Sequence, residues 1–249
     1  MIWKTLIETY DNASEAEVIT PMAHTKMMGH IGVLIDRAGN FKMAMIMNEP
    51  IFAPCTIDSE TRSSNIAPHV IHDNLSYVAS LEGYEERHAE YLHQLEVYAQ
   101  KSNDIYAKPV LNYVKKDSIL SDIGPLLSEL PKTLLLKNTN VGFAIYEFPE
   151  QPERNQTWID YYTESLPKNG ICPITGELDH IPDKYPGQIL PYARLAKLFV
   201  GKADPIEGME SLLPGYVASQ KILHTLQFLC REKTSETQEK RYVTFGKSK

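Results

Sequence analysis

Residues 31–47 read Ile-Gly-Val-Leu-Ile-Asp-Arg-Ala-Gly-Asn-Phe-Lys-Met-Ala-Met-Ile-Met, two apolar runs separated by a short polar segment. The first run, Ile31–Asp36, and the second, Phe41–Met47, carry the large apolar side chains that are typical of strands. The intervening Arg37-Ala-Gly-Asn40 contains a glycine and an asparagine, which tolerate the positive φ of a tight turn. The pattern therefore predicts an antiparallel β-hairpin.

Helical periodicity dominates most of the remaining chain. Apolar side chains recur at spacings of three and four in residues 2–10, 81–101, 104–117, 119–130, 158–165 and 216–232. Further strands are predicted at residues 133–136, 141–148 and 241–245. These elements favour an α+β fold, in which antiparallel hairpin and sheet elements pack with several helices and long functional loops.

Two irregular stretches organise the chain. Residues 48–68 are rich in proline and small polar residues and are expected to form a long connection, and long loops inside a domain are often functional. A second Pro- and Asn-rich stretch divides residues 1–150, an α+β domain with a candidate sensing loop at 56–67, from residues 151–249. The second part is loop-rich and ends in helix 216–232, unless both parts form one continuous domain.

The composition of the chain excludes several classes of protein. The 249 residues carry a net charge of −7, which argues against a protein that binds nucleic acid over its whole surface. One basic face is still compatible with this charge. No apolar run is long enough for a transmembrane helix, and the first residues lack the apolar core of a signal peptide, so we expect a cytoplasmic protein. Three widely spaced cysteines without a Cys-x-x-Cys pair predict neither disulfides nor zinc, and no cofactor motif occurs.

Two short motifs offer enzymatic alternatives. The adjacent His72 and Asp73 resemble the metal-ligating pair of a metal-dependent His-Asp phosphohydrolase, which needs further ligands from other helices. The alternative is structural, with packed histidines and an Asp73 that caps a short helix. Cys172 could act as a nucleophile if His180 served as its base, or it could be a buried thiol in a rigid turn.

The segment Arg62-Ser63-Ser64-Asn65 is the candidate DNA-binding site. Arginine can bind guanine or phosphate with two parallel hydrogen bonds. Small serine and asparagine side chains can enter a narrow minor groove and hydrogen-bond to its acceptors. The alternative is an ordinary polar surface loop that binds no DNA.

Three stretches, taken in order, carry a family resemblance. The first is Arg62–Pro68 followed by Asp73–Val78, which has the form basic-small-small, Ile-x-Pro, then Asp-Asn-x-x-Tyr-Val. The second is the Cys-Pro-Ile-Thr-Gly-Glu knuckle within Ile171–Glu177, and the third is Ala196–Phe199 followed by Gly215–Lys221. Together they resemble the N-terminal half of the large subunit of the type I-C CRISPR surveillance complex, Cascade.

The family is considerably longer than this chain, and its usual His-Pro and Ser-x-Asn stretches are replaced here by Tyr185-Pro186 and Phe199-Val-Gly. The resemblance implies a non-enzymatic subunit in antiviral defence. Such a subunit contacts the 5′ end of the crRNA, senses the protospacer-adjacent motif (PAM) of double-stranded target DNA, joins other Cascade backbone subunits and later recruits a helicase-nuclease. A pure assembly scaffold without DNA contact remains an alternative.

The resemblance implies that Ser64 and Asn65 read the minor groove and that Arg62 holds phosphate. Ser63 is the fourth DNA-binding residue expected in this loop. Further backbone contacts are assigned by charge alone to Lys115, Lys116, Lys197 and Lys221.

Overall fold

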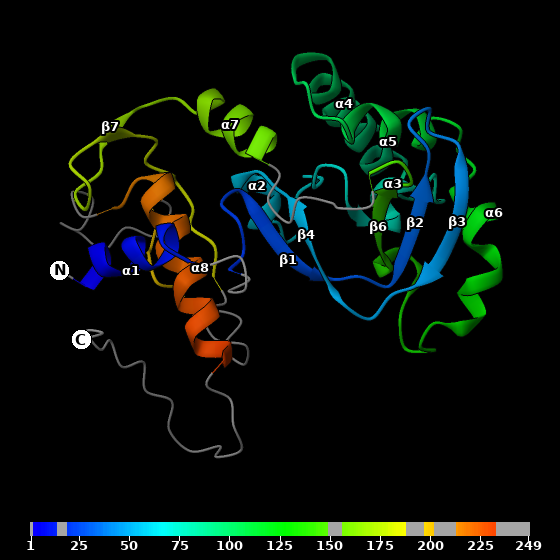
Figure 1. Ribbon diagram of the computed structural model, residues 1–249, viewed down its shortest axis with the longest axis horizontal. Coiled ribbons are helices and arrows are strands. Elements are labelled where there is room, and N and C mark those ends of the chain that lie inside the picture. The colour runs from blue at the N-terminus through cyan, green and yellow to red at the C-terminus, as the bar shows by residue number, and fades with distance from the viewer. Residues whose placement is uncertain (1, 14–18, 149–155, 188–196, 202–212, 233–249) are drawn as a thin grey trace. The chain divides into compact units, whose positions relative to one another are not determined.

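The computed structural model describes residues 2–13, 19–148, 156–187, 197–201 and 213–232 (Figure 1). These residues belong to two compact units. One unit draws on residues 1–22 and 165–249, and the other consists of residues 23–164.

The predicted hairpin is confirmed and lies in the second unit. Strand β2 (Ile31–Ile35) pairs antiparallel with β3 (Phe41–Ile46), and Gly39 in the turn has a φ of +80°. On its other side β2 pairs in parallel with β6 (Asn140–Ile145), and β6 pairs with the two-residue strand β5 (Asp73–Asn74). The sheet order is therefore β3-β2-β6-β5.

The hairpin extends beyond this sheet. Strand β1 (His24–Met28) pairs antiparallel with β4 (Pro50–Pro54). Between the two ribbons, Gly29 N–H donates to the carbonyl of Glu49 at 2.8 Å, so the hydrogen-bonded ladder continues into the ribbon. The long structureless connection predicted for residues 48–68 is thus wrong in part. Because the prolines of β4 stand at its two ends and it has one strand neighbour, they do not prevent pairing.

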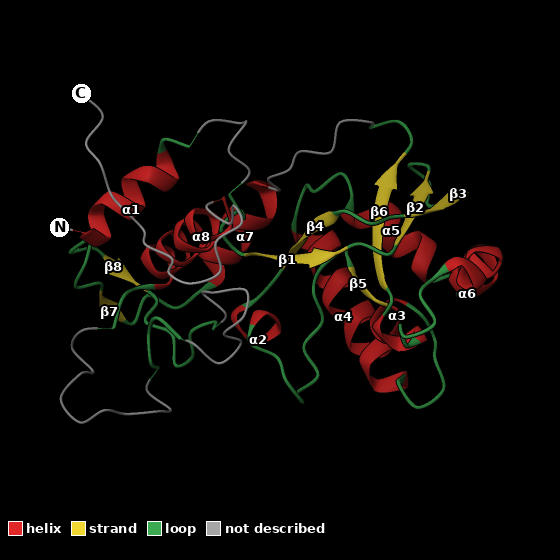
Figure 2. Cartoon of the chain, turned by 90° about the horizontal axis from the view of Figure 1, so that it is seen from below, coloured by secondary structure: helices red, strands yellow, loops and turns green. Residues whose placement is uncertain are grey.

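Several helices of the second unit lie against this sheet (Figure 2): α3 (Leu75–Val78), α5 (Ala107–Val114), α6 (Ile119–Ile123) and the 3-10 turn Gly124–Glu129 contact its strands. Helix α4 (Glu85–Lys101) packs on α3 and α5. The other helical elements in this stretch of the chain are α2 (Ile57–Glu60), α7 (Gln156–Ser165) and the 3-10 turn Leu136–Asn138. The strand predicted at 133–136 is wrong: Leu135 and Leu136 are 58% and 42% exposed. A run of leucines forms a strand only where it can pair with a neighbouring strand and pack its side chains into a core.

Side-chain alternation separates the two faces of the sheet. Val33 and Phe143 are buried on the helix side, where Tyr113 of α5 contacts Phe143 at a ring distance of 6.0 Å. The residues next to them in sequence point the other way, since successive side chains in a strand alternate. That opposite face carries Gly32 and Leu34 of β2 together with Gly142 and Ala144 of β6.

The first unit is built on two helices that the sequence predicts. Helix α1 (Ile2–Asp11) packs along α8 (Tyr216–Glu232), and the Thr225 hydroxyl donates to the carbonyl of Leu6 at 3.2 Å. Strands β7 (Gly170–Ile171) and β8 (Leu178–Asp179) form the predicted knuckle. The chain thus has the predicted α+β fold. The strand predicted at 241–245 lies outside the described residues. No described helix is long and apolar enough to span a membrane.

The hairpin turn gives a first prediction. At Gly39 a Cβ would lie 2.6 Å from the carbonyl oxygen of Pro109 in α5, and the positive φ adds its own cost. We expect Gly39→Ala to lower the free energy of unfolding by about 2 kcal/mol or more, as measured by urea denaturation. Gly83→Ala is the matched control, because Gly83 has a φ of +79° but nothing within 4 Å of the added methyl. Equal losses in the two variants would contradict the contact with α5.

Candidate nucleic-acid interface

A buried ion pair closes the base of the loop that carries the predicted DNA-binding residues. The Arg62 guanidinium donates from Nη1 to Asp73 Oδ2 at 2.7 Å and from Nη2 to Oδ1 at 2.6 Å. Its Nη1 also donates to the carbonyl of Ala67 at 2.8 Å, across the loop. The Asp73 side chain is fully buried and that of Arg62 is 18% exposed. The four residues between Arg62 and Ala67 therefore protrude from a fixed base.

Further bonds satisfy both charges. The Asp73 carboxylate accepts the backbone N–H groups of His69 and Asn74, each at 2.7 Å. The Arg62 guanidinium lies over the ring of Tyr77 at 4.5 Å, a cation–π contact. Burial lowers the pKa of Arg62, but the hydrogen bonds and charge of Asp73 outweigh this and raise its pKa above the usual value. The sequence predicts phosphate as the partner of Arg62, whereas in the structure its guanidinium is bonded to Asp73.

The entrance and exit of the loop are helix caps. Thr56 and Ser59 form a capping box at the start of α2, where each side chain accepts the backbone N–H of the other. At the exit, Asn74 caps α3 by accepting the N–H and the hydroxyl hydrogen of Ser76. The cap predicted for Asp73 is wrong, because its carboxylate is committed to Arg62.

The tip of the loop exposes hydrogen-bond donors. Ser63, Ser64, Asn65 and Ile66 are all exposed. The Asn65 side-chain oxygen accepts the N–H of Ser63 at 3.3 Å, which leaves its amide NH₂ directed elsewhere. Among the described residues, the hydroxyls of Ser63 and Ser64 have no hydrogen-bond partner. The tip can therefore offer two hydroxyls and an amide NH₂ to a ligand that presents acceptors.

The two histidines of this segment have separate partners. His69 Nδ1 lies 3.1 Å from the Ser59 hydroxyl, and His72 Nδ1 accepts the N–H of Phe143 at 3.1 Å. Burial lowers the pKa of each to about 4, so both rings are neutral at pH 7. In the described part of the chain, no three His, Cys, Asp or Glu side chains are grouped so that they could hold a metal ion. His72 and Asp73 bond to different partners rather than converging on one point.

Two predicted backbone contacts lie in the second unit and make intramolecular bonds. Lys115 pairs with Glu96 at 2.8 Å, and both side chains are exposed. Lys116 donates to the carbonyl of Gly39 at 2.6 Å and to the side-chain oxygen of Asn40 at 2.7 Å, which fixes the hairpin turn.

The other two predicted lysines lie in the first unit. Lys197 is exposed, and its backbone forms a bridge with Gly187. Lys221 pairs with Asp11 at 2.6 Å and lies 5.9 Å from the ring centre of Tyr10. The nucleic-acid contacts of the four lysines stay a prediction.

The knuckle of the first unit encloses its cysteine. Cys172 is fully buried, and its backbone bonds to Gly176 and Glu177 close the turn at 2.8 Å each. His180 directs Nδ1 to the carbonyl of Pro167 at 3.0 Å. The base that a nucleophilic Cys172 would require therefore has another partner.

Comparison with known proteins gives one family. The model of the family described as CRISPR-associated protein (Cas_Csd1) matches residues 6–194, which include the loop and its ion pair. No curated protein matches the chain.

The ion pair yields a stability prediction. Removal of one partner leaves a buried uncompensated charge, so we expect Arg62→Ala to lower the free energy of unfolding by about 3–5 kcal/mol. The double variant Arg62→Met with Asp73→Leu removes both charges and should lose clearly less than the sum of the single changes Arg62→Met and Asp73→Leu. Urea denaturation of the four proteins measures this coupling. Additive losses would show that the pair is not coupled in the folded chain.

The buried histidines predict a pH dependence. Their folded pKa of about 4 lies below the ordinary value of 6.5, so the unfolded chain binds more protons between these values. The free energy of unfolding should therefore fall as the pH is lowered from about 6.5 towards 4. Replacement of His69 and His72 by glutamine should flatten the decline between pH 6.5 and 5, where most carboxylates stay ionised. An unchanged slope would mean that the two rings titrate normally.

Proposed function

Because the chain belongs to the CRISPR-associated protein (Cas_Csd1) family, we propose that it is a non-catalytic subunit of the crRNA-guided type I-C Cascade complex. In this role it contacts the 5′ end of the crRNA and senses the PAM of target DNA. The supporting observation is the exposed tip Ser63–Asn65, held on the Arg62–Asp73 base. A short, fixed loop of small donors suits the sensing of a short DNA motif.

The chemistry of the tip matches the minor groove. Every base pair presents acceptors there, namely adenine N3, guanine N3, thymine O2 or cytosine O2. The tip offers donors, from the hydroxyls of Ser63 and Ser64 and the amide of Asn65. Its side chains are short enough for a groove about 6 Å wide. Protein contacts would read the short motif, and base pairing with the guide would read the remaining sequence.

Arg62 acts in this proposal mainly as a positioning residue. Its two terminal nitrogens hold Asp73 and Ala67, which sets the height and direction of the tip. The phosphate contact predicted from the sequence stays a prediction, and salt dependence separates the two roles. Loss of one phosphate contact lowers the slope of log affinity against log salt by about one, whereas loss of positioning alone lowers affinity at an unchanged slope.

The remaining partners follow from the same proposal. The crRNA, other Cascade subunits and the helicase-nuclease would contact further surfaces in the cytoplasm. Backbone contacts are proposed for Lys115, Lys116, Lys197 and Lys221. The ammonium groups of Lys115, Lys116 and Lys221 would exchange their present acceptors for phosphate. The net charge of −7 is compatible with this arrangement if affinity for nucleic acid is shared among subunits.

The decisive prediction concerns the tip. Ser64→Ala with Asn65→Ala should weaken binding of a PAM-containing duplex by about ten-fold or more, since each lost base-edge contact costs about 1–3 kcal/mol. The measurement is an equilibrium binding assay on the complex purified from co-expression of this chain, the other type I-C subunits and a guide RNA. Co-purification of the variant chain shows that assembly is intact.

A matched control replaces an exposed serine and an exposed asparagine elsewhere in the same unit, Ser128→Ala with Asn103→Ala. This variant should bind the duplex as the unchanged complex does. Normal, PAM-dependent binding by the tip variant would refute the site. Co-purification without any PAM-dependent binding would favour a scaffold role.

A further inference from the structure

The ring of Tyr77 in α3 joins the sensing loop to a second arginine. The Ala67 N–H, at the end of the loop, donates to the Tyr77 hydroxyl at 3.4 Å, and the Arg62 guanidinium lies 4.5 Å from the centre of the ring. The guanidinium of Arg87 in α4 lies 5.3 Å from the centre of the same ring. The Asp73 carboxylate already matches the charge of Arg62. Arg87 is therefore the second arginine that could contact phosphate beside the tip.

Arg87 is held in place without a counter-charge. Its Nη1 donates to the Ser76 hydroxyl at 3.3 Å, and that hydroxyl donates to Asn74, the cap at the exit of the loop. Its guanidinium also lies 5.3 Å from the ring centre of Tyr84, where α4 begins. Among the described residues, no carboxylate lies within 4 Å of it. Its remaining side-chain N–H groups can therefore bind an anion.

The stability of α4 does not explain why an arginine stands at this position. Arg87 is the third residue of the helix, and a positive charge in the first turn is repelled by the partial positive charge of the helix N-terminus. The contacts with two tyrosine rings offset this repulsion and keep the side chain beside the loop. The position is thus suited to a cation that binds a partner.

A lysine lies at the second ring. Lys137, in the 3-10 turn Leu136–Asn138, places its Nζ 5.5 Å from the ring centre of Tyr84. Within the described ranges, its ammonium group has no hydrogen bond or ion pair. The turn is tied to the start of α3, because the Leu75 N–H donates to the carbonyl of Thr139 at 2.9 Å. Two cations that are far apart in the sequence therefore share one ring, close to the exit of the loop.

Glutamates at the start of α4 do not neutralise these two cations. Glu82, Glu85 and Glu86 are exposed, and the Glu85 carboxylate accepts the N–H of Gly83 at 2.9 Å. None of the three carboxylates lies within 4 Å of either cation, and exposed charges interact weakly across water. The glutamates instead confine the positive surface to the two cations, so a broad basic patch does not form here.

We propose that Arg87 and Lys137 bind backbone phosphates of the target duplex beside the tip. The inference rests on the proposed sensing role, because a tip inside a minor groove about 6 Å wide has phosphates on both sides of it. Arg87 would bond phosphate oxygens with its free N–H groups, and Lys137 would contribute a point charge. These two cations, rather than Arg62, would hold the DNA backbone while residues 63–65 contact the base edges.

The test measures the salt dependence of DNA binding. It uses the complex purified from co-expression of this chain, the other type I-C subunits and a guide RNA, with duplexes that contain or lack the PAM. Arg87→Gln and Lys137→Gln should each lower the slope of log affinity against log salt by about one, and the double variant by about two. Because phosphates carry no sequence information, affinity should fall by the same factor for both duplexes.

Two further variants separate phosphate binding from a structural role. Lys101→Gln removes an exposed lysine from the other end of α4, roughly 21 Å away along the helix axis, and should leave the slope unchanged. Arg87→Lys keeps the positive charge and should retain most of the slope that Arg87→Gln loses. Co-purification of all subunits with a normal amount of guide RNA shows that assembly is intact.

An unchanged slope in both glutamine variants would overturn the proposal. Loss of guide RNA from these variants would also overturn it, because the cations would then hold the crRNA, and loss of a subunit would assign them to an acidic protein surface. The tip variant Ser64→Ala with Asn65→Ala is measured in parallel and should lower PAM preference at an unchanged slope. A tip variant that binds normally, together with lowered slopes in the cation variants, would keep the phosphate contact and refute the sensing tip.

Discussion

The bidentate pair between Arg62 and Asp73 holds three neighbouring segments of the second unit together. A carboxylate with no exposed surface is stable only if its charge is matched, and here a guanidinium and two backbone N–H groups match it. The same guanidinium bonds across the loop to Ala67. One interaction thereby fixes the loop, the entry into β5 and the start of α3, so the exposed donors at residues 63–65 project from a rigid support.

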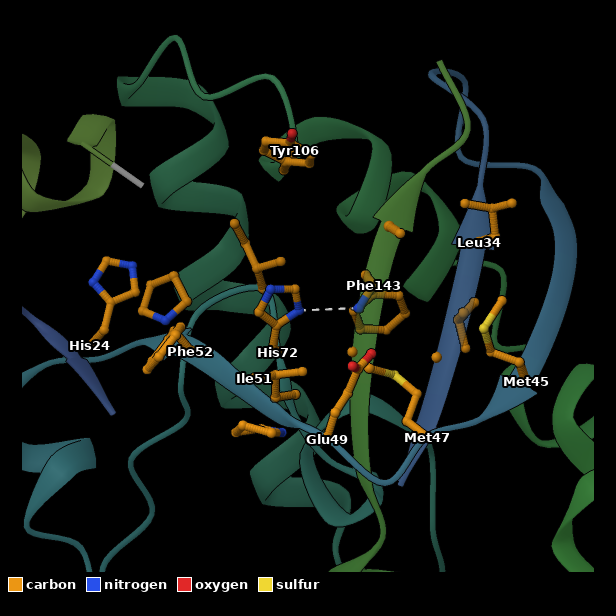
Figure 3. Close-up of a pocket in the computed structure, with 17 residues that line it drawn as sticks. His24, Leu34, Met45, Met47, Glu49, Ile51, Phe52, His72, Tyr106 and Phe143 are labelled. Atoms are coloured by element: carbon orange, nitrogen blue, oxygen red, sulfur yellow. Dashed lines mark hydrogen bonds between the residues drawn. The ribbon is translucent and has the colours of Figure 1, made fainter. Parts of the chain in front are cut away.

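The segment next to this pair makes two separate sets of contacts. Asp73 bonds to Arg62 beneath the loop, while the preceding His72 bonds to the edge of β6 at Phe143 and lines a cavity between β4 and the sheet (Figure 3). Because β5 has only two residues, it leaves the Phe143 N–H without a strand partner, and the imidazole takes that place. The strained φ of Ile71 lets successive residues meet these separate demands. A change in this short segment would therefore affect both the base of the loop and the edge of β6.

The proposed roles use hydrogen-bond donors rather than general positive charge. Lys115, Lys116 and Lys221 donate to intramolecular acceptors, and the chain as a whole is acidic. Electrostatic affinity for nucleic acid would then come mainly from partner subunits, and this chain would add local contacts of defined geometry. Such a division fits the proposed role, in which guide pairing would carry most of the sequence information.

The sequence alone determined the local elements: the hairpin at residues 31–47, the helices at 2–10 and 216–232, and the polar tip Ser63–Asn65. Each depends on turn chemistry or on a side-chain period within a short window, which is written in consecutive residues. The tertiary structure decided the parallel pairing of β6 with β2, the partner of Arg62 and the cavity. These join residues far apart in the chain, and a single sequence carries no local pattern for which buried carboxylate an arginine reaches or which glycines of two strands become neighbours.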